Sequence, residues 1–84
     1  MVKVVITPVA AEQFDALPLT IRERIRKLFA RLEAWPEVSG AKPLRGELKG
    51  WYRLRTGDYR LRFRVQGESV TVDKIGHRRD VYEG

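Results

Sequence analysis

Residues 59–65, in the second half of the chain, alternate apolar side chains with arginines. Successive side chains of a β-strand point to opposite faces, so Arg60, Arg62 and Arg64 would form a cationic stripe backed by apolar residues. Soon afterwards, residues 76–82 read Gly-His-Arg-Arg-Asp-Val-Tyr and add two guanidiniums, an imidazole and a phenol. Arginine is suited to planar, bidentate contacts with phosphate. These two segments therefore predict a surface that holds phosphate.

An alternating arginine pattern has a second interpretation, a solvated strand face that discourages edge-to-edge pairing. Three observations favour phosphate binding instead. The stripe contains arginine rather than a mixture of lysine and glutamate, few acidic residues interrupt it, and Arg53 and Arg55 precede it in another alternating run.

The length and composition predict one domain, residues 1–84, with a modest core and a stability that is marginal without a partner. The chain has no cysteine and one histidine. Disulfides, thiolate metal sites and histidine-rich metal sites are therefore excluded, and we expect neither a metal nor another cofactor.

The charge is unevenly distributed along the chain, whose formal net charge is +6. Six basic and five acidic residues precede Lys42, whereas eleven basic and six acidic residues lie from Lys42 onward. We therefore expect an anionic ligand on the C-terminal half and a scaffold in the N-terminal half. No apolar run is long enough to span a bilayer or act as a signal peptide, so we expect a soluble cytoplasmic protein without a membrane partner.

The elements that must position these residues follow from hydrophobic periodicity. Residues 2–6 are predicted as a strand, and a first helix is predicted over residues 8–17 with proline at its first position. Apolar residues at helical spacing predict a second helix over residues 19–35, which Pro36 ends. The two helices would form a hairpin that covers one face of a sheet.

The second half predicts a long loop followed by three antiparallel strands. Residues 36–50 show no clear period and are predicted to form neither helix nor strand. Alternating runs at 51–55, 59–65 and 69–75 are separated by glycine-containing hairpin turns. The predicted architecture is α+β, a four-stranded sheet with both helices on one face and the arginines on the face open to water. Trp51, at a loop-to-strand junction, is expected to pack on the domain rather than to stack on a base.

Three motifs, in this order and at these spacings, resemble the signature of the RelE/ParE superfamily of toxin–antitoxin toxins. They are Leu-Arg-Gly at residues 44–46, Trp-Tyr-Arg-Leu-Arg-Thr-Gly-Asp-Tyr-Arg at residues 51–60, and the segment at residues 76–82. The resemblance covers essentially the whole chain and implies a compact fold like that of microbial ribonucleases. For the RelE branch it implies metal-independent cleavage of mRNA in the ribosomal decoding site, and neutralisation by a co-encoded antitoxin.

The resemblance also assigns roles to individual residues. Arg53 and Arg55 fall where RelE-type toxins place basic residues, commonly lysines, and Arg60 falls on the arginine of a Tyr-Arg pair. Arg78 falls on the arginine of the last strand, and Tyr82 falls near the C-terminal tyrosine of the family.

Cleavage by a 2′-hydroxyl requires a base, an acid and cations that stabilise the charge developing on the phosphate. Arginine stays protonated in proteins and cannot readily replace a lysine as the base. His77 is the predicted candidate, with support of the sheet edge or orientation of a phosphate as alternatives. Tyr82 is predicted to act as acid or base or to stack on a nucleotide. Basic residues predicted to contact RNA more widely are Lys42, Arg45, Lys49, Arg62, Arg64 and Arg79.

Two other functions fit the same sequence. One is a ParE-like inhibitor that binds DNA gyrase, and the other is a non-toxic binding module in which lysine-to-arginine changes have removed the chemistry. In each case we expect an acidic or amphipathic antitoxin segment that folds on the basic face. The free chain is predicted to be a monomer, and its antitoxin complex a hetero-oligomer.

Overall fold

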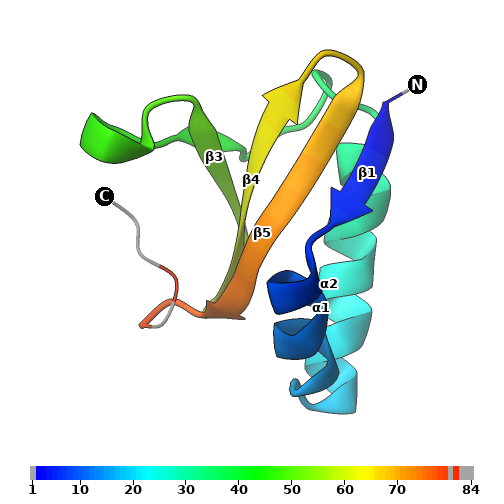
Figure 1. Cartoon of the computed structure of the whole chain (residues 1–84). Helices are drawn as coiled ribbons and strands as arrows, with labels where there is room; N and C mark the ends of the chain where they lie inside the picture. The colour runs from blue at the N-terminus through cyan, green and yellow to red at the C-terminus, as the bar shows by residue number, and fades with distance from the viewer. Residues whose placement is uncertain (1, 80, 82–84) are drawn as a thin grey trace.

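The computed structural model describes residues 2–79 and Val81, and these residues form two helices, five strands and one short 3-10 helix (Figure 1). In chain order the elements are β1 (Lys3–Ile6), α1 (Pro8–Asp15), α2 (Leu19–Leu32), β2 (Lys42–Pro43), η1 (Gly46–Leu48), β3 (Trp51–Thr56), β4 (Tyr59–Gln66) and β5 (Ser69–His77). The predicted α+β class is confirmed, but the sheet contains one strand more than the four expected.

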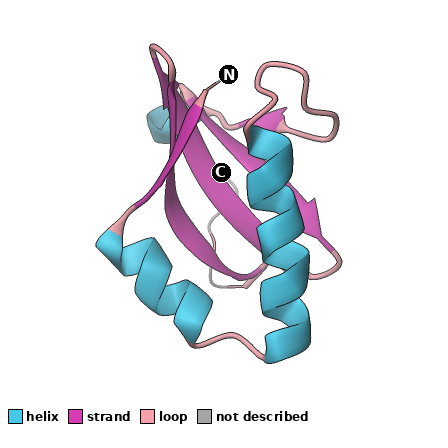
Figure 2. Cartoon of the chain, turned by 90° about the vertical axis from the view of Figure 1, so that its right-hand side faces the viewer, coloured by secondary structure: helices cyan, strands magenta, loops and turns pink. Residues whose placement is uncertain are grey.

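The strands form one sheet in the order β1-β5-β4-β3-β2. Strand β1 pairs in parallel with β5, whereas the other neighbouring strands are antiparallel. The helical hairpin connects β1 at one edge with β2 at the other edge, so both helices lie across the same face (Figure 2). No helix among the described residues is long and apolar enough to cross a membrane.

The core lies between this face and the helices. Alternate residues of the three long strands meet the apolar side of α2 and, from α1, Ala10 and Phe14. The fully buried members of this cluster are Ala10, Ile25, Leu32, Leu61, Phe63, Val70 and Val72. Leu44 and Val81 are also buried, at 5% and 1% exposure, but they lie outside this cluster.

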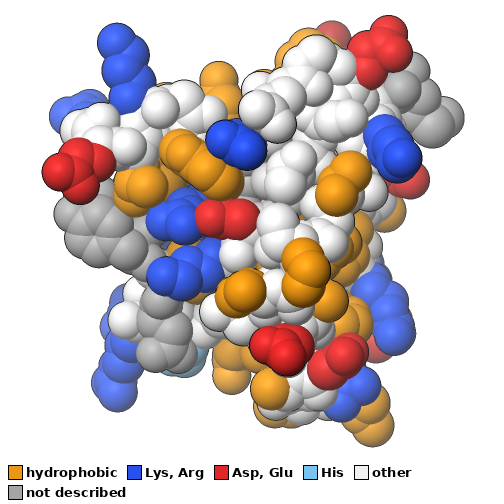
Figure 3. Space-filling model, in the orientation of Figure 1, with side chains coloured by type: hydrophobic (Ala, Val, Ile, Leu, Met, Phe, Trp, Pro, Cys, Tyr) orange, Lys and Arg blue, Asp and Glu red, His pale blue; other side chains and the backbone are white. Residues whose placement is uncertain are grey.

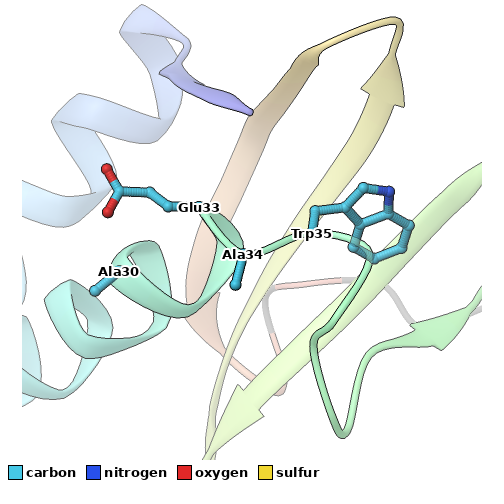
Figure 4. Close-up of a pocket in the computed structure, with 4 residues that line it drawn as sticks. All are labelled: Ala30, Glu33, Ala34 and Trp35. Carbon is cyan, nitrogen blue, oxygen red and sulfur yellow. The ribbon is translucent and has the colours of Figure 1, made fainter. Parts of the chain in front are cut away.

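Both helices begin as expected and end earlier than predicted. The Thr7 hydroxyl caps α1 by accepting a hydrogen bond from the Ala10 amide at 3.2 Å, and Pro8 occupies the first turn. The apolar pattern overestimated α2 because Trp35 packs on the sheet beyond the helix. Its ring lies 4.9 Å from Tyr52 and 5.5 Å from Phe63. Figure 4 shows Trp35 in the segment after α2, where it lines a hollow with Ala30, Glu33 and Ala34.

The expectation that residues 36–50 form neither helix nor strand is wrong. Two residues of this segment, β2, pair with β3, with Lys42 opposite Arg53 and Pro43 opposite Tyr52. The Leu44 amide continues the pairing by donating to the Trp51 carbonyl at 2.9 Å. A two-residue strand contains too few residues to show a period, which explains why the pattern did not predict it.

A bulge interrupts the β4–β5 pairing. Arg62 pairs with Lys74, whereas the next residue, Phe63, pairs with Val72. Asp73 is therefore the extra residue on β5, and a bulge of this kind redirects the side chains around it.

Candidate nucleic-acid interface

The sheet face opposite the helices carries rows of arginines from neighbouring strands. In the β3–β4 register, Arg55 lies opposite Arg60 and Arg53 lies opposite Arg62. Paired residues point to the same face of a sheet, so these four side chains share the open face. Figure 3 shows Lys and Arg side chains gathered beside an acidic side chain on the side of the molecule away from the helices. The predicted arginine stripe therefore exists, but not all of it is solvated.

Arg60 occupies the centre of the basic face and is only 7% exposed, although a position open to water was expected. Arg55 lies opposite it on β3, and Gly76, which has no side chain, lies opposite it on β5. Burial lowers the pKa of Arg60, and the charges of Arg53, Arg55 and Arg78 lower it further, against a smaller opposing effect of Asp58. The guanidinium nevertheless stays charged at neutral pH. We call Arg53, Arg55, Arg60 and Arg78 the arginine cluster.

Arg62 lies two residues along the same strand, in a different environment. Its Nε donates to Asp73 Oδ1 at 3.0 Å, and a second guanidinium nitrogen donates to Asp73 Oδ2 at 2.6 Å. This bidentate hydrogen bonding raises the pKa of Arg62, against the lowering effect of burial. The side chains of this pair are only 15% and 21% exposed. Arg62 is therefore held by the protein itself.

Trp51 packs on the domain as expected, but it contacts arginines of the open face and does not enter the core. It is half-buried and lies opposite Arg64 in the β3–β4 register. The guanidinium carbons of Arg62 and Arg64 lie 5.0 and 5.1 Å from its ring centroid, within the range of cation–π contacts. Trp51 alternates with Arg53 and Arg55 along β3, which places its side chain on their face of the sheet.

Two residues of the open face were missed by the sequence analysis, Asp73 and Lys74. Lys74 lies opposite Arg62 and adds another cation to this row. The sequence contains a signal for both, because Val72 and Ile75 are separated by two polar residues where strict alternation allows one. Both of these apolar residues are buried in the core, so the chain between them must bulge.

The structure separates His77 from the arginine cluster. A side chain at position 76 would point toward the arginine cluster. Adjacent residues of a strand point to opposite faces, so His77 faces the helices. Its ring meets Tyr59 edge-on with centroids 5.5 Å apart, and it helps to line a hollow of about 360 Å³ with Gln13 and Leu17. Its Nδ1 accepts a hydrogen bond from the Arg79 amide at 3.2 Å. Its role as a catalytic base stays a prediction.

Two of the predicted residues beyond the end of β5, Arg78 and Arg79, lie in a turn. Arg78 is exposed, and its amide donates to the Asp58 carbonyl at 2.7 Å. This bond fixes the turn beside the β3–β4 hairpin, where the charge of Arg78 acts on Arg60. Arg79 is also exposed, whereas Tyr82 lies outside the described residues.

The predicted basic residues of the 36–50 segment are spread along the β2 edge. Lys42 is exposed and extends the Arg53 row across the sheet. Arg45 and Lys49 are exposed residues that flank the short helix η1. These three residues are thus placed around the arginine cluster rather than in it.

The chemistry of the site is that of clustered guanidiniums. Residues 2–79 and Val81 contain no group of three or more His, Cys, Asp or Glu side chains that could hold a metal ion. Arginines crowded at a partly desolvated position favour an anion, because a bound negative charge relieves their mutual repulsion. The arrangement is suited to binding a phosphate and to stabilising charge that develops on it.

Comparison with known proteins identifies the family. A family model described as the ParE toxin of the type II toxin–antitoxin system parDE matches residues 4–82. The chain belongs to this toxin family. It is 25% identical to toxin RelE3 of Methanocaldococcus jannaschii over 84 residues, 96% of each chain. It is also 46% identical to toxin RelG of Mycobacterium tuberculosis, but over 43 residues, about half the length of each chain.

The fold agrees with this assignment. The toxin–antitoxin complex RelBE2 of Mycobacterium tuberculosis contains a chain that superposes with a TM-score of 0.80 at 28% identity. The alignment covers 92% of this toxin and 98% of that chain. The resemblance to the RelE/ParE superfamily is thereby confirmed, and the protein is a toxin of a type II toxin–antitoxin system.

Proposed function

We propose that this toxin inhibits translation by cleaving mRNA in the ribosomal decoding site without a metal ion. The observation that carries the proposal is the position of Arg60, which is 7% exposed and lowered in pKa by burial and by three other arginines. Side chains with perturbed pKa values cluster at functional sites, so a site for an anion is consistent with this concentration of guanidiniums. The phosphodiester of RNA is an anion of suitable shape for guanidinium forks.

In the proposed reaction the 2′-hydroxyl of one nucleotide attacks its own 3′-phosphate. The bond from phosphorus to the 5′-oxygen of the next nucleotide breaks, which leaves a 2′,3′-cyclic phosphate and a free 5′-hydroxyl. Negative charge increases on the non-bridging oxygens as the pentacoordinate phosphate forms. Arg55, Arg60 and Arg78 would donate to these oxygens, with Arg53 at the next position of the row.

The proton-transfer groups are a separate part of the proposal. The attacking hydroxyl must lose a proton, and the departing 5′-oxygen must gain one. His77 and Tyr82 are the proposed groups, although His77 faces the helices next to Tyr59. The ribosome is the proposed context because it would present an unpaired, stretched mRNA to the basic face.

We further propose that a cognate antitoxin covers the basic face when the toxin is inactive. The support is twofold: the similar Mycobacterium tuberculosis chain was solved in a toxin–antitoxin complex, and this chain carries a net charge of +6. An acidic segment that folds on binding would neutralise the arginine cluster. The free toxin is proposed to be a monomer and the complex a hetero-oligomer.

A second candidate function is inhibition of DNA gyrase by binding, which the ParE description of the matching family model favours. In that case the arginine cluster would bind an acidic surface of the enzyme or its DNA. Inhibition of supercoiling by purified toxin, with mRNA left intact on ribosomes, would select this candidate.

The deciding experiment adds purified toxin to ribosomes programmed with a defined mRNA and maps cleavage by primer extension. The test variant is Arg55→Ala with Arg78→Ala, because both side chains are exposed and their loss should not disturb the core. The control is Arg24→Ala with Lys27→Ala, which removes the same charge from exposed positions of α2. Decoding-site cuts that vanish only in the test variant would support the proposal, whereas no cuts by the wild-type toxin would refute it.

A further inference from the structure

The open face contains an aromatic position beside the arginine cluster. Trp51 is half-buried, lies outside the core, and shares its face of β3 with Arg53 and Arg55. We propose that Trp51 is a stacking platform for one unpaired base of the RNA whose phosphate the arginine cluster binds. This inference rests on the proposed function, because it adds a base-binding subsite to the same face.

The distances from Trp51 to Arg53 and Arg55 along β3 suit the reach from a phosphate to the base of one nucleotide. Residues two apart on a strand are separated by about 7 Å, so Trp51 lies about one such step from Arg53 and about two steps from Arg55. A phosphate bound between Arg53 and Arg55 would therefore place its attached base, or that of the neighbouring nucleotide, within reach of the indole. A base in a duplex already has stacking partners, so the platform selects single-stranded RNA.

The side chains around Trp51 allow a base to reach its ring. Two hydrogen bonds to Asp73 of β5 fix the guanidinium of Arg62. The same guanidinium contacts the Trp51 ring and holds the indole against β4. Arg64 is exposed, and among the described residues its guanidinium has no carboxylate partner. Arg64 can therefore move off the ring at little cost and contact a phosphate or the far side of the base. An exposed cation–π contact is weaker than a stacked base, so a base is expected to displace it.

The test uses the intrinsic fluorescence of the platform. Trp51 and Trp35 are the two tryptophans of the chain, and Trp35→Phe leaves Trp51 as the single reporter. The probe is a short RNA made uncleavable by 2′-O-methylation, compared with an RNA of equal length and charge in which the bases are replaced by abasic sites. We expect the RNA with bases to quench Trp51 emission, and the abasic RNA to bind without quenching.

Affinity provides a second readout that does not depend on the Trp35→Phe background. In the otherwise unchanged toxin, Trp51→Ala is expected to weaken binding of the RNA with bases roughly 5- to 140-fold, as loss of one stacked base does. Trp51→Phe should retain most of the affinity, and the abasic RNA should not distinguish the three proteins.

The outcomes separate this inference from the proposed function. Equal affinity of the wild-type toxin and Trp51→Ala for the RNA with bases, at unchanged cleavage on ribosomes, overturns the platform and leaves the nuclease proposal standing. Absence of any RNA binding also overturns the platform. Quenching and a Trp51→Ala defect without cleavage on ribosomes would support the platform and refute the nuclease proposal.

Discussion

Arg60 and Arg62 lie two residues apart on the same face of one strand, yet their environments shift their pKa values in opposite directions. Burial and neighbouring arginines lower the pKa of Arg60. The bidentate bond to Asp73 raises the pKa of Arg62. Burial and like charges thus act against the charge of the first guanidinium, whereas a carboxylate stabilises the charge of the second.

This difference indicates how an RNA phosphate would interact with each arginine. A carboxylate already uses the fork of Arg62, so an RNA phosphate would have to compete with Asp73 for it. Arg60 lies among like charges, so a phosphate bound beside it would interact favourably with several guanidiniums at once. We therefore expect the arginine cluster to act on RNA, and the Arg62–Asp73 pair to hold the face in shape.

The largest effect is expected on catalysis, when the Arg60 charge is removed. Arg60→Met should reduce mRNA cleavage on programmed ribosomes by about 100- to 1,000-fold, the usual loss when a preorganised donor to a developing charge is removed. The measurement is a single-turnover cleavage rate, with Arg24→Met as the control. Urea denaturation of the same variant separates a loss of cleavage rate from a loss of folding. A loss of stability without a loss of rate would contradict the role given to Arg60.

The next largest effect is expected on stability, when Arg62 loses its carboxylate partner. Asp73→Ala should lower the free energy of unfolding by about 1–3 kcal/mol, because it removes two charge-assisted bonds and leaves Arg62 partly buried without its carboxylate. Urea denaturation measures this loss. Glu68→Ala, an exposed acidic residue in the β4–β5 turn, should change stability by less than about 0.5 kcal/mol. Similar values for the two variants would show that the Arg62–Asp73 pair does not stabilise the fold.

The smallest effect concerns the salt dependence of RNA binding. Each phosphate contact to single-stranded nucleic acid adds about −0.7 to the slope of log affinity against log salt concentration. Arg55→Ala should therefore make the slope shallower by about 0.7, whereas Arg24→Ala should leave it unchanged. Fluorescence titrations at several salt concentrations measure both slopes. An unchanged slope in Arg55→Ala would place the phosphate elsewhere.

The sequence predicted most of the fold because prolines and glycines mark the ends of its elements and its apolar residues recur at regular spacings. Pro8, Pro18 and the two glycine hairpin turns delimit elements whose apolar residues recur at helical or strand spacing. Strand β2 escaped prediction because it has two residues and exists only through pairing with β3. The helical pattern extended past Leu32 because Trp35 reaches the core from an irregular segment.

The candidate site was predicted less completely, since side-chain direction depends on pairing. Alternation placed the arginines on one face, but it did not show that Arg60 is buried or that Asp73 pairs with Arg62. The bulge at Asp73 and the outward position of Trp51 were missed although the sequence indicates both. Two polar residues separate Val72 from Ile75, and Trp51 alternates with Arg53 and Arg55. His77 was grouped with the arginines by proximity in sequence, although adjacent strand residues point to opposite faces.

The most direct test of the contrast between the two arginines is an NMR titration that follows the Nε–H signals of Arg60 and Arg62 in one protein. The ligand is a short 2′-O-methylated RNA, and Arg60→Lys and Arg62→Lys assign the signals. The Arg60 signal is expected to shift on binding while the Arg62 signal, held by Asp73, stays in place. A shift of Arg62 with Arg60 unmoved would contradict the account and assign the phosphate to the other arginine.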